Sequence, residues 1–146
     1  MIETRPTICN LCGGRVKYTS NAEIYGREFG SGKCYLCLSC RAYVGCHKPN
    51  PKEAMGILAD ANMRKGKMMC HEIFDSKWKC EDKPKKKRGK LYGWLSVQLG
   101  IPIDDCHFGH FDIHMLRKAY RILLQIKDIP LEYDDNGRIS NEITIT

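Results

Sequence analysis

The sequence predicts an α+β protein in which a small four-cysteine zinc ribbon of antiparallel β-structure packs on about three helices. Three observations lead to this prediction. Two Cys-x-x-Cys pairs lie in the first 40 residues, short β-like runs separated by turn residues surround them, and later apolar residues recur at helical spacing. We therefore expect a zinc-ribbon-like β module over 1–48, a helical module over 53–127, and a tail or hairpin over 128–146.

The composition indicates the redox environment of the chain. Its 146 residues include nine cysteines, an odd number that argues against a complete set of disulfides. The N-terminal MIETRPTICN lacks the apolar stretch of a signal peptide, and no later segment is long enough to cross a membrane. We therefore expect a reducing cytoplasm, where pairs of cysteines are more often metal ligands than disulfides.

The β module contains the predicted metal site. Cys9 and Cys12 form one clear knuckle, and the two glycines that follow let backbone amides approach the sulfurs. The second knuckle is either Cys34 with Cys37 or Cys37 with Cys40. We favour Cys37 and Cys40, because the 24 residues between the knuckles then leave room for a hairpin.

Four thiolates complete the coordination of one Zn²⁺ ion and leave no position open for water, so the predicted zinc is structural. It replaces the core that so short a β unit cannot build. Reduced thiols without metal and an iron–sulfur cluster are the alternatives. Arg41 follows the second knuckle where the first has glycine, which departs from the pattern.

Three helices are expected in the second module. The first lies within 53–80, the second in KLYGWLSVQLG, and the third over 113–127 with Asp112 as its N-cap. Residues 83–90, KPKKKRGK, contain no apolar residue, and we expect them to form a loop, with a frayed connection as the alternative. The Asn-Gly dipeptide in the tail predicts a hairpin, with a disordered end as the alternative.

The net charge of +7 favours an acidic partner, and nucleic acid is the first candidate. The predicted loop could neutralise several phosphates and form one positive surface with the basic side of the last helix. A solvated loop that only keeps the chain soluble is the alternative. The candidate nucleic-acid-binding residues are Lys83, Lys85, Lys86, Lys87, Arg88, Lys90, Arg117, Lys118 and Arg121.

Three Cys-His dipeptides and a further histidine are left over. They could assemble a second metal site, but none has zinc-knuckle spacing, so packing where the ribbon meets the helices is the simpler interpretation. Nearby aspartates would also permit a metal-dependent nuclease or hydrolase, although Asp112 is more simply a helix cap. The candidates for a second site or interface are Cys46, His47, Cys70, His71, Cys106, His107 and His110.

Five segments follow one another in a distinctive order: CNLCGG, CLSCRAYVGCH, GILADANMRKGKMMCHEIFDSKWK, YGWLSVQLGI and CHFGHFD. Over about residues 8–125, this order resembles the small zinc-finger-containing proteins of bacteriophages and prophages that are catalogued as a domain of unknown function. The resemblance implies a zinc-ribbon-like half followed by a helical half. It implies Cys9, Cys12, Cys37 and Cys40 as ligands, and His47, His71 and His107 as parts of the family's pattern.

We therefore predict a zinc-stabilised, non-enzymatic binding protein, encoded by a phage or prophage and located in the cytoplasm of its bacterial host. The leading function is nucleic-acid binding through the basic segment and helix face. The alternatives are a phage effector that binds and inhibits a host defence or transcription protein, and a metal-dependent nuclease or hydrolase. One structural Zn²⁺ ion and no membrane partner are expected, and the oligomeric state is left open.

Overall fold

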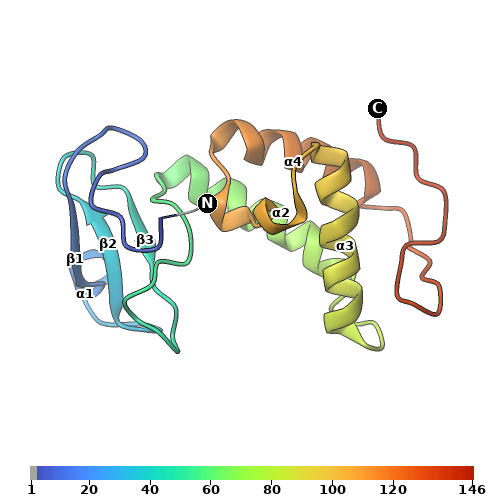
Figure 1. Cartoon of the computed structure of the whole chain (residues 1–146), viewed down its shortest axis with the longest axis horizontal. Coiled ribbons are helices and arrows are strands. Elements are labelled where there is room, and N and C mark those ends of the chain that lie inside the picture. Colours follow the sequence, from blue (N-terminus) through green and yellow to red (C-terminus); the bar gives the residue numbers. More distant parts are fainter. Residues whose placement is uncertain (1–2) are drawn as a thin grey trace. The chain divides into compact units, whose positions relative to one another are not determined.

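The computed structural model describes residues 3–146, and the chain divides into two compact units. The first unit ends at Arg64 and the second begins at Lys65. Figure 1 shows the antiparallel strands of the first unit and the long helices of the second. A three-stranded antiparallel sheet with four close cysteines, together with several helices, confirms the predicted α+β class.

The first unit is built on the sheet β1 (Val16–Ser20), β2 (Lys33–Cys37) and β3 (Tyr43–Gly45), in that spatial order. β1 and β3 contribute valine, threonine and tyrosine side chains, which suit a pleated, half-buried surface. β2 is the central strand, and all of its residues after the first are buried. A single helical turn, α1 (Ala22–Tyr25), lies in the connection between β1 and β2.

The first unit extends past the predicted end of the β module at residue 48. The reason is that the chain returns to the sheet: the Tyr43 and Ala59 backbones exchange hydrogen bonds of 3.2 and 2.9 Å. Residues from this returning segment also enter the core, so the segment belongs to the β unit rather than to the first helix. The core consists of Cys9, Tyr35, Cys37, Ala42, Val44, Cys46, Ala54 and Leu58.

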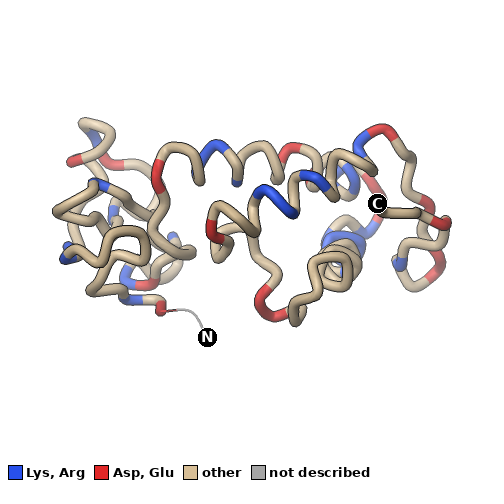
Figure 2. The backbone as a smooth tube through the Cα atoms, turned by 90° about the horizontal axis from the view of Figure 1, so that it is seen from above, with Lys and Arg blue, Asp and Glu red and all other residues tan. Residues whose placement is uncertain are grey.

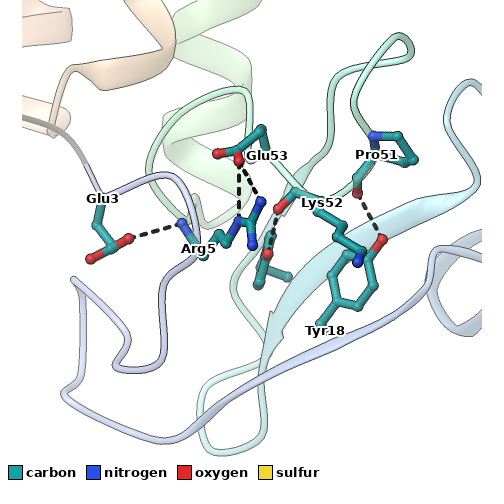
Figure 3. Close-up of polar contacts among 7 residues, drawn as sticks. Glu3, Arg5, Tyr18, Pro51, Lys52 and Glu53 are labelled. Carbon is teal, nitrogen blue, oxygen red and sulfur yellow. Dashed lines mark hydrogen bonds and ion pairs between the residues drawn. The ribbon is translucent and has the colours of Figure 1, made fainter.

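Polar contacts hold the turn at 48–53 against the rest of the first unit (Figure 3). The Arg5 guanidinium donates to one carboxylate oxygen of Glu53 from Nη2 at 2.9 Å and from Nε at 3.1 Å. The Tyr18 hydroxyl donates to the Pro51 carbonyl at 2.8 Å. This turn is therefore attached to the N-terminal segment through Arg5 and to β1 through Tyr18.

The second unit contains the long helices α2 (Ala61–Ser76), which starts in the first unit, α3 (Pro84–Leu99) and α4 (Ile113–Ile126). Two 3₁₀ turns, η1 (Ile103–Asp105) and η2 (Phe108–His110), connect α3 to α4. Among residues 3–146, no helix combines the length and the apolar character needed to cross a bilayer. The largest fully buried side chains of the unit are Phe74, Phe108, Leu91, Leu95, Leu116, Leu123 and Ile126.

The first long helix begins later than the predicted start of the helical module at residue 53. The Asp60 carboxylate accepts the Met63 amide at 2.8 Å, which satisfies a free amide at the start of α2. At the start of α4, the predicted cap is present, because the Asp112 side chain accepts the Met115 amide at 2.8 Å.

The basic segment 83–90 is largely helical, and the predicted loop is wrong. Pro84 is the first residue of α3, where a fixed φ favours the helix and no N–H is needed. Lysine and arginine are good helix formers, so the absence of apolar residues does not oppose a helix. Lys87 and Leu91 lie one helical turn apart and are both buried, which anchors the first turns of α3.

The tail forms a single bridge rather than a regular hairpin. Tyr133 pairs with Ile139 across the turn that contains the Asn-Gly dipeptide, from which the hairpin was predicted. The Asp134 amide donates to the Arg138 carbonyl at 2.8 Å. The Tyr133 hydroxyl donates to the Lys77 carbonyl, which attaches the turn to the residue that follows α2.

Candidate metal centre

The first knuckle, Cys9 to Cys12, is closed by backbone hydrogen bonds. The Cys9 amide donates to the Gly14 carbonyl at 2.8 Å, and the Gly13 amide donates to the Cys9 carbonyl at 2.9 Å. Gly13 has a φ of 76°, a left-handed conformation that glycine adopts without steric cost. The turn directs the amides of Leu11 and Gly14 at the sulfurs of Cys9 and Cys12, each at 3.3 Å.

The second knuckle, Cys37 to Cys40, repeats this arrangement. The Cys37 amide donates to the Ala42 carbonyl at 2.8 Å, and the Arg41 amide donates to the Cys37 carbonyl at 3.1 Å. Arg41 has a φ of 68° and therefore occupies the position that Gly13 has in the first knuckle. The departure from glycine is accommodated by a strained backbone, at a cost of about 1–2 kcal/mol. The Cys40 amide points at the Cys37 sulfur at 3.4 Å.

The two knuckles bring four sulfurs together. The ligand atoms of Cys9, Cys12, Cys37 and Cys40 all lie within 4.8 Å of one another. The Cys9–Cys40 sulfur distance is 3.8 Å and the Cys12–Cys37 distance is 3.5 Å. Zinc–sulfur bonds of about 2.3 Å in a tetrahedron separate the sulfurs by about 3.8 Å, whereas a disulfide bond measures about 2.05 Å. The cluster therefore fits one zinc ion and is not a pair of disulfides.

Cys34, the alternative ligand, lies outside this cluster. It is 1% exposed within β2, where it pairs with Gly45 of β3. Burial raises the pKa of its thiol, which favours the neutral form. Cys34 therefore packs as a small apolar group, as the sequence indicates for the thiol that the second knuckle leaves out.

The environment of the cluster favours a thiolate at Cys37. At Cys40 the Ala42 amide lowers the thiol pKa, but burial and the neighbouring sulfurs outweigh it and raise that pKa to about 12. Cys9 and Cys37 are buried, whereas Cys12 and Cys40 are exposed. The Cys40 amide is the main reason that the pKa of the Cys37 thiol falls to about 6, and zinc binds cysteine as thiolate. Four thiolates fill a tetrahedral zinc site, so a zinc ion held here would stabilise the fold and leave no coordination position for a substrate.

The predicted second metal site is not assembled within either unit. Cys46 and His47 belong to the first unit, where Cys46 is in the core and the His47 amide donates to the Glu53 carbonyl at 2.9 Å. Over residues 3–146, no group of three or more His, Cys, Asp or Glu residues comes together apart from the four cysteines. The other five candidates belong to the second unit and are Cys70, His71, Cys106, His107 and His110.

In the second unit, Cys70, His71 and Cys106 pack among core side chains, whereas His107 is exposed. Burial raises the pKa of Cys70 to about 12 and that of Cys106 to about 11, so both are neutral thiols at physiological pH. The Cys70 sulfur lies 3.6 Å from the Leu116 carbonyl, to which it can donate a hydrogen bond. The His71 ring meets the Phe108 ring edge to face, with 4.8 Å between centroids. Packing therefore accounts for these three residues, and the exposed His107 ring lies 5.2 Å from the His110 ring, centroid to centroid.

Two of the candidate nucleic-acid-binding residues in α3 are engaged within the second unit. Lys87 is 8% exposed, and its ammonium pairs with Asp82 and lies 3.8 Å from a Glu81 oxygen. Lys87 is therefore not available to bind a phosphate, because it is buried and two carboxylates already neutralise its charge. The Arg88 guanidinium lies over the Tyr92 ring, 5.1 Å from its centroid, and is still exposed.

Apart from Lys90, which is half-buried in α3, the remaining candidate residues form two clusters and not the one positive surface that the sequence allowed. Figure 2 shows lysines and arginines along α3 and α4. The Lys118 ammonium donates to the Leu99 carbonyl at 3.1 Å, at the end of α3 opposite Lys85. At 1.5 Å per residue, about 20 Å of helix separates Lys85 from Leu99. The N-terminal cluster is Lys83, Lys85 and Lys86, and the α4 cluster is Arg117, Lys118 and Arg121; all six residues are exposed.

Comparison with known proteins identifies the family. A family model described as a zinc-finger-containing domain matches residues 5–126. No curated protein and no solved structure shows significant similarity to the chain. The match includes both knuckles and helices α2 to α4, and it leaves out the tail. Because it covers most of the chain and includes the four-cysteine cluster, the protein belongs to the DUF3268 family of zinc-finger-containing domains.

Proposed function

We propose that the protein is a zinc-stabilised, non-enzymatic binding protein that engages nucleic acid through the N-terminal cluster of α3 and the α4 cluster. The observation that supports this proposal is the exposure of Lys83, Lys85 and Lys86, which make no ion pair with another residue of the described range 3–146. They surround the positive end of the α3 dipole, which adds to their attraction for phosphate. The first turn of α3 itself holds no acidic residue, and the nearest carboxylates are those of Asp82, Asp134 and Asp135, which line a pocket with Lys83 and Lys86.

The spacing of the two clusters suits an extended polyanion. Phosphates along one strand of duplex DNA are about 3.4 Å apart, so about 20 Å corresponds to about six phosphate steps. A single nucleic acid could therefore contact both clusters at once. Binding would release condensed counterions and would depend little on sequence, because lysine contacts to phosphate carry no base information.

The salt dependence of binding tests this proposal. The triple variant Lys83→Ala, Lys85→Ala, Lys86→Ala should weaken binding to a DNA duplex and reduce the slope of log K against log salt by about three. The matched control is Lys52→Ala, Lys65→Ala, Lys127→Ala, which removes the same charge from exposed positions outside both clusters. Equal losses in the two triple variants would show that only net charge matters, and unchanged binding in the first would refute the proposal.

The alternatives predicted from the sequence give different results when the same variants are used to capture a partner. A protein that binds a host factor would retain its partner after nuclease treatment, and the first triple variant would then affect protein capture and not DNA binding. A phage or prophage origin and a cytoplasmic location in the host stay predictions from the resemblance. A hydrolase would need carboxylates gathered around a metal, whereas Asp112 caps α4.

A further inference from the structure

An aromatic groove opens on the first unit beside α1, which Figure 1 shows next to the sheet. Its volume is about 540 Å³, and its lining is mainly apolar. Tyr25 is 50% exposed, Phe29 is 46% exposed and Met55 is 52% exposed. Exposed apolar side chains that gather at one groove indicate a binding surface. Neither the metal site nor the two basic clusters include residues of this groove.

The groove is held in shape before any ligand binds. Asn21 is 7% exposed, and its side chain binds both backbone groups of Phe29: Nδ2 donates to the carbonyl at 2.8 Å, and Oδ1 accepts the amide at 3.1 Å. The Tyr25 ring meets the Phe29 ring edge to face at 5.5 Å and the Tyr43 ring at 6.1 Å. Rings that are already fixed lose little conformational freedom on binding.

The charges around the groove select the class of ligand. Lys33 and Lys48 line it, and none of its lining residues is an aspartate or glutamate. Arg27 adds a third cation, with its guanidinium 4.6 Å from the Phe29 ring centroid. Exposed aromatic rings beside cations are the features that bind single strands, in which unpaired bases stack and phosphates are neutralised. A duplex offers no free base face to such rings.

We propose that this groove binds unpaired nucleotides of single-stranded nucleic acid, with a base stacked at Phe29 and the flanking phosphates near Lys33 and Lys48. The inference rests on the proposed function and deepens it, because it names single strands as a ligand and adds a surface on the other unit. Stacking is tolerant of sequence, since every base has a flat face, so little base preference is expected.

Substitutions at Phe29 test the stacking contact. The full-length, zinc-loaded protein is titrated into a fluorescent oligodeoxythymidine of about 20 nucleotides, longer than the ~16 nucleotides that a single OB fold can cover. Phe29→Ala should weaken binding between about fivefold and about a hundredfold. Phe29→Leu should lose as much, whereas Phe29→Trp should bind like the wild type, with its indole fluorescence quenched. Val97→Ala, at a 75% exposed position, is the control for loss of an exposed apolar side chain.

Each outcome separates this inference from the proposed function. Wild-type affinity in Phe29→Ala, or equal affinity of Phe29→Leu and Phe29→Trp, would overturn the groove assignment. If the lysine triple variant still lost duplex binding in that case, the proposed function would stand alone. An equal loss of duplex and oligothymidine binding in Phe29→Ala would refute the assignment to single strands, and a wild-type protein that bound neither would refute both. Zinc content and circular dichroism of every variant verify the fold.

Discussion

Removal of the metal should unfold the first unit and leave the second unit folded. A unit of about 60 residues has a free energy of unfolding of about 3–9 kcal/mol at the usual 0.05–0.15 kcal/mol per residue. Structural zinc contributes an apparent ~10–16 kcal/mol of binding free energy in small zinc fingers. Because the metal contribution exceeds the stability of a unit of this size, we expect no folded first unit without zinc. None of the four cysteines lies in the second unit, which has its own core.

The two units can be followed separately. Both tryptophans, Trp78 and Trp94, belong to the second unit, so their fluorescence reports its unfolding alone. Amide hydrogen exchange in β1 and β2 reports the first unit. A zinc chelator should abolish exchange protection in these strands and leave the thermal transition of tryptophan fluorescence unchanged.

A ligand substitution makes the same test without a chelator. Cys37→Ser should act like zinc removal, because Cys37 is 0% exposed and supplies one of the four sulfurs. Cys80→Ser is the matched control, since Cys80 is an exposed thiol outside the cluster. Protected strands in the metal-free protein, or a Cys37→Ser variant with normal zinc content and exchange, would refute the argument.

Three further predictions concern local features. Asp112→Ala removes the acceptor of the Met115 amide and should destabilise the second unit by ~1 kcal/mol. Its melting temperature, followed by tryptophan fluorescence, should fall by about 4–8 °C. Asp112→Asn should retain most of the wild-type stability, because asparagine also caps helices. Burial lowers the pKa of His71 below 6.5, so the unfolded chain binds more protons and stability is lost as pH falls from 6.5 towards the folded-state pKa. The melting temperature of the second unit should therefore fall less on acidification in His71→Phe than in the wild type, and parallel curves would contradict this. Gly13→Ala should destabilise the first unit by ~1 kcal/mol, whereas Arg41→Gly should not destabilise it, because both positions have positive φ and glycine adopts this conformation without steric cost. Competition for zinc with a chelator measures both variants. Equal effects of the two substitutions would count against the shared geometry.

The metal centre could be predicted from sequence because its signals are local. A Cys-x-x-Cys pair encodes one turn, and the spacing between Cys12 and Cys37 leaves room for the β1–β2 hairpin that joins the knuckles. The Asp112 cap is local in the same sense. Arg41 shows the limit of such reasoning, since the hydrogen bonds of the knuckle impose a left-handed backbone on a residue that rarely adopts it.

The basic helix could be predicted only in part. Pro84 at the first helical position was a usable signal, and a search for apolar periodicity alone misses it. The burial of Lys87 depends on contacts from beyond its own helix. Its ammonium lies 4.9 Å from the centroid of the Tyr133 ring, which comes from the tail, and it pairs with Asp82 before the helix. Exposure of individual lysines therefore could not be derived from the charge pattern.

The aromatic groove and the metal cluster lie at opposite ends of one hairpin. Val16 pairs with Cys37 at the metal end, and Ser20 pairs with Lys33 at the end from which the loop containing Phe29 extends. Four strand steps of about 3.3 Å separate Cys37 from Lys33, so the ion could not touch a ligand in the groove. Zinc therefore affects the groove only through the folding of the strands between them. For this reason a Phe29 variant should keep its zinc while losing single-strand binding, whereas Cys37→Ser should lose both.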